Sequence, residues 1–374
     1  MKKKCLFLFS LLCIGVSATA CLDDETSKIT QESYPLMAFS VGVENAATGA
    51  VTYYHGDIDQ TEHKVNIGSI TNLYSITDVD YTLEEGATIS PDPSAWIGNW
   101  KKDQTVTVTG ADGATTSYVI TFTQYDESMD NVLFYDDFSG SDRIPDDSKW
   151  SLCARQTSDW NEEMSESYDQ AYVDTETGEL VLRAEQIDGE YQSGGIETQN
   201  KFAFTFGKVE VRAKIVRYPD GAFPAIWMMP QTFIYAGWPA CGEIDIMEHI
   251  KQDGFIYSSI HNHYYDTMGN DDPSHTATVA CDIEEYHVYG VEWTEDELVF
   301  TLDGQETFIY PNLHLENEAE MMQWPFTADA SFYLILNMGL GSNTSSGSWA
   351  GPIDDAGLPA EMRVDWVKVT RLDD

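Results

Sequence analysis

The chain consists mainly of short runs in which apolar and polar residues alternate, the pattern of half-buried β-strands. The clearest unit joins two β-branched runs, 105–109 and 118–123, through a turn at 110–113, and it predicts a hairpin. Further strands are expected at 51–54, 64–67, 180–184, 208–215, 286–293, 298–302, 307–310 and 332–337. The sequence contains no long amphipathic helix and no internal repeat, so the pattern predicts an all-β protein.

Length and the distribution of turn residues predict two domains behind a leader. Residues 36–126 carry short strands with turn signals and predict a small immunoglobulin-like β-sandwich. A polar linker follows, and a second strand-rich domain spans 131–372. We expect the first domain to act as a spacer. Sugar binding through Trp96 and Trp100 is the alternative, although tryptophans more often serve in a core or loop.

The N-terminus has the features of a bacterial export signal. After a basic start, residues 5–16 form an apolar run that is too short to span a membrane. Ala18-Thr19-Ala20-Cys21 then resembles a lipobox, which predicts a signal peptide over 1–20, lipid on Cys21 and a tether over 21–35. The acidic residues that follow resemble those of surface-exposed outer membrane lipoproteins. A periplasmic or secreted protein is the alternative.

The net charge of the chain limits the classes of partner that it can bind. The formal net charge is −43 at pH 7, with 63 acidic and 20 basic residues. Such a charge argues against nucleic acid and repels strongly sulfated or uronic polysaccharides. It favours a neutral glycan, bound by a protein that we expect to be a monomer. After processing, the remaining cysteines are Cys153, Cys241 and Cys281, so at most one disulfide can form.

The most informative segment is Gly242-Glu243-Ile244-Asp245-Ile246-Met247-Glu248, which places three carboxylates among apolar residues. On a strand, Glu243 and Asp245 share a face. Strict alternation would put Met247 next on that face, whereas a β-bulge would bring Glu248 there instead. In so acidic a protein, the alternative is an ordinary strand whose acidic side chains are solvated. The apolar residues between the acids favour a bulged, half-buried strand.

Two glutamates on one surface suit glycoside hydrolysis, in which one carboxylic acid protonates the leaving oxygen and the other carboxylate attacks or activates water. Four regular steps separate Glu243 and Glu248 by roughly 13 Å at Cα, and inward-leaning side chains bring a carboxyl gap of about 5–5.5 Å within reach. That gap predicts a retaining mechanism. Asp245, between them, would keep their two pKa values apart.

The stretch from Trp238 to Glu248 resembles the catalytic signature of glycoside hydrolase family 16 in its bulged, laminarinase-like form. Segments 134–138, 206–214, 224–230 and 364–369 resemble further family strands, so the resemblance covers roughly 131–372. It implies a concanavalin-like β-jelly roll of two curved antiparallel sheets with an open cleft. It also implies that Glu243 is the nucleophile, Glu248 the general acid/base and Asp245 the assisting carboxylate.

Several aromatic and polar residues are candidates for binding sugar, because rings stack on sugar faces and amides bind hydroxyls. By resemblance to cleft-lining segments of the family, these are Trp160, Asn161, Trp227, Trp238, His261, Asn337 and Trp349. The usual compact glycine pair near Asn337 is replaced by a longer run at 341–348, which changes the local subsite. His261 and His263 would share a strand face, but the spacing does not match a zinc site.

We therefore expect an endo-acting, retaining β-glycosidase that needs no cofactor and cleaves a neutral β-1,3- or β-1,4-linked polysaccharide. Laminarin or mixed-linkage β-glucan is the first choice, and poly-lactosamine of mucin O-glycans is the alternative. A non-catalytic glycan-binding lipoprotein and a transglycosylase remain open. A structural calcium, as in some relatives, would have Asp137 and Asp365 as candidate ligands.

Overall fold

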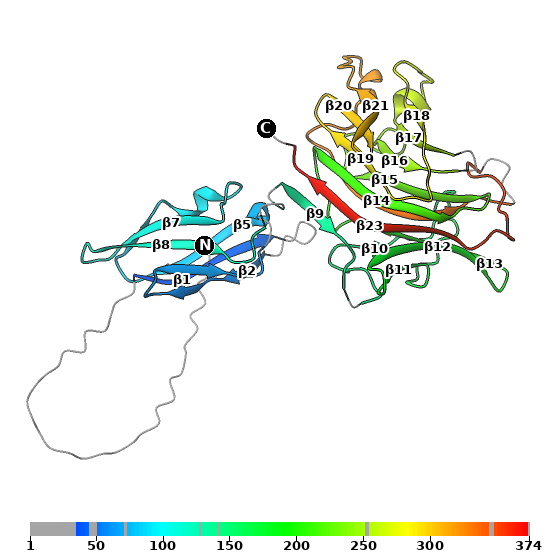
Figure 1. The fold of residues 1–374 in the computed structure, drawn as a ribbon. Coiled ribbons are helices and arrows are strands. Elements are labelled where there is room, and N and C mark those ends of the chain that lie inside the picture. Colours follow the sequence, from blue (N-terminus) through cyan, green and yellow to red (C-terminus); the bar gives the residue numbers. More distant parts are fainter. Residues whose placement is uncertain are drawn as a thin grey trace, which may run out of the picture. The chain divides into compact units, whose positions relative to one another are not determined.

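The computed structural model describes residues 35–44, 51–70, 73–126, 129, 131–140, 142–250, 254–343 and 348–372 (Figure 1). The expected signal peptide, the lipidation site Cys21 and nearly all of the tether lie outside these residues. In the described part of the chain the only α-helix is the single turn α1 (His263–Asp266), and the rest is strand, 3-10 turn and loop, which confirms an all-β protein. None of its helices is long and apolar enough to cross a membrane.

The N-terminal domain is a sandwich of two sheets. One sheet contains β2 (Val51–His55), β1 (Leu36–Glu44) and β5 (Ile76–Leu83) in that order. The other contains β3 (Asp57–Asp59), β4 (Lys64–Ile67), β8 (Thr115–Phe122), β7 (Asp103–Thr109) and β6 (Thr88–Ser90), with β4 and β8 parallel. The expected 105–123 hairpin is therefore confirmed as β7 and β8.

Apolar side chains from both sheets form the core of this sandwich, because alternate residues of each strand face the partner sheet. Trp100 belongs to that core and packs edge-on against Phe122, with ring centroids 5.5 Å apart. Half-buried Trp96 packs in turn against Trp100. The commoner interpretation of Trp100, a core residue, is therefore correct.

The C-terminal domain is built from antiparallel strands that follow one another in a continuous hydrogen-bonded path (Figure 1). One half of the path contains β18 (Thr276–Ala280), β17 (Phe255–His261), β16 (Glu243–Glu248), β15 (Ala222–Thr232), β22 (Ser331–Leu340) and β13 (Glu190–Glu197). The other half contains β12 (Glu179–Ile187), β23 (Ala360–Thr370), β14 (Gly207–Arg217), β19 (His287–Trp293), β20 (Glu297–Leu302) and β21 (Gln305–Pro311). Three short strands pair alongside: β9 (Val132–Asp136), β10 (Ser151–Leu152) and β11 (Ala171–Asp174).

The two halves enclose one large hydrophobic core, as the jelly-roll prediction requires. In β22, Phe332, Leu334 and Leu336 point into this core. Tyr333 and Ile335, between them, point to the opposite face. The same alternation holds on β15, where Ile226 and its partners face the core. The face turned away from the core, which we call the cleft face, carries the candidate site.

Candidate active site

A β-bulge in β16 brings the three carboxylates to the cleft face. On the β15 side, Trp227 pairs with Asp245 but the preceding Ile226 pairs with Met247, so one residue of β16 is extra. On the β17 side the pairing skips in the same place, between Asp245 and Glu248. The bulge expected at 246–247 is therefore confirmed.

The bulge buries two consecutive apolar side chains on the core side. Ile246 and Met247 are 2% and 0% exposed, and both belong to the main core together with Ile244. The carbonyl that the bulge displaces, that of Ile246, accepts a hydrogen bond from Ser258 Oγ at 2.9 Å. With these side chains directed inward, Glu243, Asp245 and Glu248 all lie on the cleft face.

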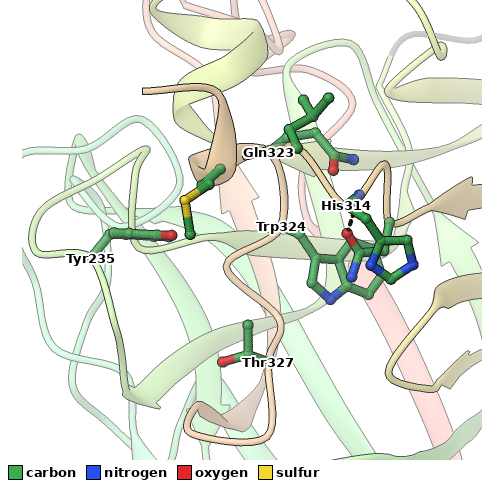
Figure 2. Close-up of a pocket in the computed structure, with 8 residues that line it drawn as sticks. Tyr235, His314, Gln323, Trp324 and Thr327 are labelled. Atoms are coloured by element: carbon green, nitrogen blue, oxygen red, sulfur yellow. Dashed lines mark hydrogen bonds between the residues drawn. The ribbon is translucent and has the colours of Figure 1, made fainter. Parts of the chain in front are cut away.

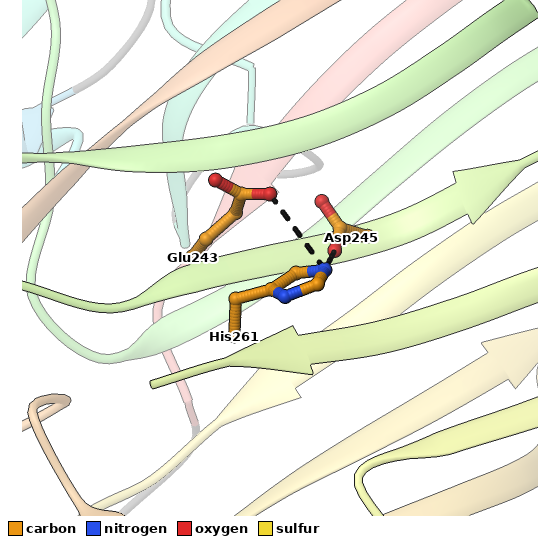
Figure 3. A group of neighbouring side chains, drawn as sticks. All are labelled: Glu243, Asp245 and His261. Atoms are coloured by element: carbon orange, nitrogen blue, oxygen red, sulfur yellow. Dashed lines mark ion pairs between the residues drawn. The ribbon is translucent and has the colours of Figure 1, made fainter. Parts of the chain in front are cut away.

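His261, at the end of β17, faces the first two carboxylates, as Figure 3 shows. Its Nε2 lies 3.5 Å from Asp245 Oδ2 and 4.0 Å from Glu243 Oε1. Its Nδ1 pairs with Asp266 Oδ1 at 3.0 Å. Asp266 is held in turn by α1, because its other oxygen accepts the Asn262 backbone N–H at 2.9 Å. His261 therefore bridges the catalytic strand and a fixed carboxylate.

The surroundings of the three carboxylates shift their pKa values for different reasons. Burial, together with repulsion from Glu243, raises the pKa of Glu248 to about 7, against the opposing effect of His261. Burial also raises the pKa of Glu243, but His261 and the hydrogen bond from Trp238 lower it. Asp245 Oδ2 accepts no hydrogen bond from any described residue, although His261 Nε2 lies 3.5 Å from it. Burial and the charges of the two glutamates hold the pKa of Asp245 well above its usual range. Burial and the neighbouring charges thus disfavour the anion of Asp245, whereas His261 and Trp238 favour the anion of Glu243.

His261 itself carries a raised pKa. Burial lowers it, but the hydrogen bond to Asp266 and the charges of Glu243, Asp266 and Glu248 outweigh burial. The pKa of Asp266 is lowered, because burial is outweighed by the hydrogen bond and charge of His261 and by the Asn262 N–H. The imidazolium form is therefore favoured beside Glu243.

Two exposed tryptophans lie at the two ends of the carboxylate row. Trp238 is 57% exposed, and its Nε1 donates to Glu243 Oε2 at 2.9 Å. Trp349 is 49% exposed and packs edge-on against Tyr257, the residue paired with Glu248, with ring centroids 6.0 Å apart. Stacking of sugar on these two rings stays a prediction.

The other expected sugar-binding residues form a buried support instead of an open surface. Trp227 is 5% exposed, and its Nε1 donates to Asn337 Oδ1 at 2.7 Å. Half-buried Trp160 packs edge-on against Trp227, with ring centroids 4.8 Å apart. Asn161 is 2% exposed, and its Oδ1 accepts the Ser158 backbone N–H. The structure thus joins Trp160, Trp227 and Asn337 beside the catalytic strand. Their direct contact with sugar stays a prediction.

Glu243, Asp245 and His261 also form a group that suits a metal ion, because one ligand atom from each lies within 4.8 Å of the others. The raised pKa of Asp245 works against a metal ion there, because a carboxyl group must be deprotonated to act as a ligand. Of the two calcium candidates, Asp365 forms an ion pair with Arg212, and Asp137 accepts hydrogen bonds from Ser139. Calcium at these two residues and a cofactor-free active site both stay predictions.

A separate cavity of about 160 Å³ lies between the loop that precedes β16 and the loop that follows β21 (Figure 2). It has room for about five waters, and the carboxylates do not line it. Trp324 is buried in its wall, and Gln323 is held by hydrogen bonds to Tyr310 and the Pro311 carbonyl. The other lining residues are Tyr235, Asn312, His314, Leu315, Met321 and Thr327.

Sequence reasoning missed two polar residues of the site region. Asp266 carries no motif, and its role depends on the turn of α1 that folds it back onto His261. Glu197 ends β13 on the cleft face, and no sequence signal marks that face. The cysteines were left open, and Cys153, Cys241 and Cys281 are all free thiols. Burial raises the pKa of Cys241, which disfavours its thiolate form.

Family models match both domains. Residues 1–138 match a domain of unknown function, DUF4971, and residues 159–368 match glycosyl hydrolases family 16. A keratan-sulfate endo-1,4-β-galactosidase from Sphingobacterium multivorum is 36% identical over 64% of this chain, and the match spans only 55% of that relative. A β-glucanase from Rhodothermus marinus is 34% identical over 63% of this chain and 82% of the relative.

A solved structure, described for endo-acting O-glycanases of the human gut microbiota that initiate mucin breakdown, has the same fold. It is 38% identical, with a TM-score of 0.58, and the match covers 65% of this chain and 100% of that one. The bulged acidic strand, the two-sheet architecture and the family model over 159–368 agree. The chain therefore belongs to glycosyl hydrolases family 16.

Proposed function

We propose that this protein is an endo-acting, retaining β-glycosidase of neutral glycans. The observation that carries the proposal is the bulge in β16, which places Glu243, Asp245 and Glu248 on one face with separated protonation behaviour. Glu248, with a pKa of about 7, starts as the acid that protonates the leaving oxygen. Glu243, stabilised as an anion by Trp238 and His261, attacks the anomeric carbon.

The remaining steps follow from the same geometry. Departure of the leaving group turns Glu248 into a base, which takes a proton from water as that water attacks the glycosyl–enzyme bond. Asp245, whose raised pKa favours its protonated form, donates to the nucleophile's carboxylate as charge returns to it. A second sugar in place of water gives transglycosylation. Exposed Trp238 and Trp349 hold sugar rings on the two sides of the cleavage point.

The proposed substrate is a β-1,3- or β-1,4-linked chain, with laminarin or mixed-linkage glucan as first choice. The relatedness to the Rhodothermus β-glucanase supports this choice. Poly-lactosamine of mucin O-glycans, cut as an endo-β-galactosidase would cut it, is the second candidate. The higher identities to the galactosidase and to the O-glycanase structure favour it.

The decisive experiment is a glycan panel with wild type, Glu243→Gln and Glu248→Gln. Wild type is expected to release oligosaccharides from one panel member, and proton NMR of the first product should show a β-anomer. The Glu243→Gln variant is expected to release none. Equal binding with no release by either protein would leave a glycan-binding lipoprotein as the function, and an α-anomer would exclude the retaining mechanism.

We also propose that lipid on Cys21 anchors the protein in the bacterial outer membrane, facing outward. The lipobox-like sequence Ala18-Thr19-Ala20-Cys21 supports the anchor. Labelling with a palmitate analogue should mark wild type and not Cys21→Ala, and protease added to whole cells should remove the protein. Labelled protein that resists protease in intact cells would place it in the periplasm.

A further inference from the structure

Glu197 lies in the same row of cross-strand neighbours as Asp245. It pairs with Ile335, Ile335 pairs with Trp227, and Trp227 pairs with Asp245. Directly paired residues of antiparallel strands point to the same face. Because Ile335 and Trp227 face away from the core and Ile196 faces into it, Glu197 points to the cleft face.

The β13 backbone next to Glu197 lies in close contact with its neighbours on that face. A Cβ atom added to Gly195, two residues before Glu197, would come within 2.9 Å of the Asn337 Cβ and 3.0 Å of the Cys153 Sγ. Glycine is therefore needed there, and the next side chain of β13 on this face is that of Glu197.

The Glu197 carboxylate has no hydrogen bond or ion pair with any other residue in the described ranges. It is half-buried, and burial raises its pKa to about 7. Tyr333 lies two residues from Ile335, the partner of Glu197, so it is the diagonal neighbour of Glu197 on the same face, and the charge of Glu197 raises the pKa of Tyr333. A carboxylate withdrawn from water without donors is costly, so this position is suited to receiving donors from a ligand.

The group next to Glu197 supplies further polar atoms. Tyr333, on the same face of β22, has its hydroxyl oxygen occupied as an acceptor by Gln199 Nε2 at 3.0 Å. The Tyr333 hydroxyl therefore retains its own proton to donate. One acceptor and one donor side by side match the hydroxyl groups of a sugar.

The distance from the reaction centre excludes a role in bond cleavage. Three strand spacings separate Glu197 from Asp245, which amounts to roughly 14 Å across the sheet. A sugar at Glu197 is therefore a different residue of the chain from the one at the carboxylates. Only an extended glycan reaches both places.

We propose that Glu197, with Tyr333 and Gln199, forms a distal subsite that binds an uncharged sugar by its hydroxyls and excludes a sulfated or uronic one. This inference rests on the proposed function. The carboxylate accepts a sugar hydroxyl and repels an anionic substituent at the same place. The subsite makes the enzyme specific for the unmodified stretches of its glycan.

The test compares Glu197→Gln with Glu190→Gln, a matched control that removes one carboxylate from the exposed start of the same strand. The substrates are laminarin and poly-lactosamine, each in neutral and chemically sulfated form, together with short oligosaccharides of the chain that is cut. For Glu197→Gln we expect kcat/KM on the long neutral chain to fall on the order of tenfold. We expect kcat/KM on the short oligosaccharides to stay unchanged. The rate of cleavage of the sulfated chain relative to the neutral chain should rise.

A Glu197→Gln variant that matches Glu190→Gln on all substrates would overturn the subsite while leaving the proposed function intact. If wild type cuts none of the glycans, the proposed function fails, and binding decides the subsite. Affinity electrophoresis then compares Glu243→Gln with the double variant Glu243→Gln/Glu197→Gln. The gels contain laminarin or poly-lactosamine, each in neutral and sulfated form. An unchanged preference for the neutral over the sulfated form would overturn the subsite there as well. Equal melting temperatures of Glu197→Gln and wild type confirm that folding is intact.

Discussion

The indole N–H of Trp238 donates to Glu243 Oε2 at 2.9 Å, so a side chain exposed to the cleft also holds the proposed nucleophile. In the proposed mechanism, binding and chemistry are joined in this one residue. A sugar that stacks on the Trp238 ring would fix the ring, and the fixed ring would fix the carboxylate. The proposed mechanism thus makes the loop before β16 part of the catalytic apparatus.

Replacing Trp238 with phenylalanine keeps a ring for stacking and removes this donor. The anion of Glu243 loses a charge-assisted hydrogen bond worth about 1.5–3 kcal/mol, so kcat/KM should fall ten-fold or more. The pKa of Glu243 should rise, and the acidic limb of the pH–rate profile should move to higher pH. Trp349→Phe, which removes no bond to a carboxylate, is the control. An unshifted acidic limb would contradict the role of the bond.

The alkaline limb reports Glu248. Because Glu248 must carry a proton to act as acid, kcat/KM should decline as pH rises through about 7, its raised pKa. In Glu248→Gln this limb should vanish. Activity on an aryl glycoside with a good leaving group should persist through the first step, with azide restoring turnover. A profile that stays flat to pH 9 in wild type would show that another group protonates the leaving oxygen.

The His261–Asp266 pair predicts a pH-dependent stability. The folded-state pKa of His261 is raised, so its contribution is full below its unfolded value of about 6.5 and is lost as pH rises through the folded value. Asp266→Asn should therefore lower the free energy of unfolding more at pH 6 than at pH 9. Urea denaturation at the two pH values measures this. An equal loss at both would mean that Asp266 acts only through the Asn262 N–H.

The hydrogen bond from Trp227 to Asn337 stabilises the cleft face beside β16. Asn337→Ala leaves a buried indole N–H without its acceptor, at a cost of about 1–3 kcal/mol. For a domain of this size, the melting temperature should fall by about 2–4 °C for each kcal/mol. Trp227→Phe removes the donor, so the double variant should cost less than the sum of the single variants. Additive losses would show that the two side chains are independent.

Much of the architecture was accessible from the sequence because it rests on local alternation. The strands expected at 64–67, 208–215 and 332–337 are β4, β14 and β22. The bulge was predictable for a related reason: Ile246 and Met247 are adjacent apolar residues, and adjacency breaks a period of two. Both signals lie within a few residues of chain.

Properties that depend on distant pairing were not accessible. Asn337 is buried with a partner that is remote in sequence, Trp227, whereas buried Asn161 accepts a hydrogen bond from Ser158 within its own turn. Glu197 occupies the cleft face only because of its register with β22. Asp266 reaches His261 only because α1 ends one turn after it begins. Sequence patterns do not report which side chains a sheet places opposite one another.

The pair of inward-facing residues at the bulge also locks the alignment of the catalytic strand. A slip of β16 by one position against β15 would turn the three carboxylates toward Ile226 and Met228, and Ile246 with Met247 toward the cleft. Burying three acids makes that misfolded arrangement costly. The three carboxylates on the cleft face therefore also disfavour, during folding, a one-residue slip of their own strand.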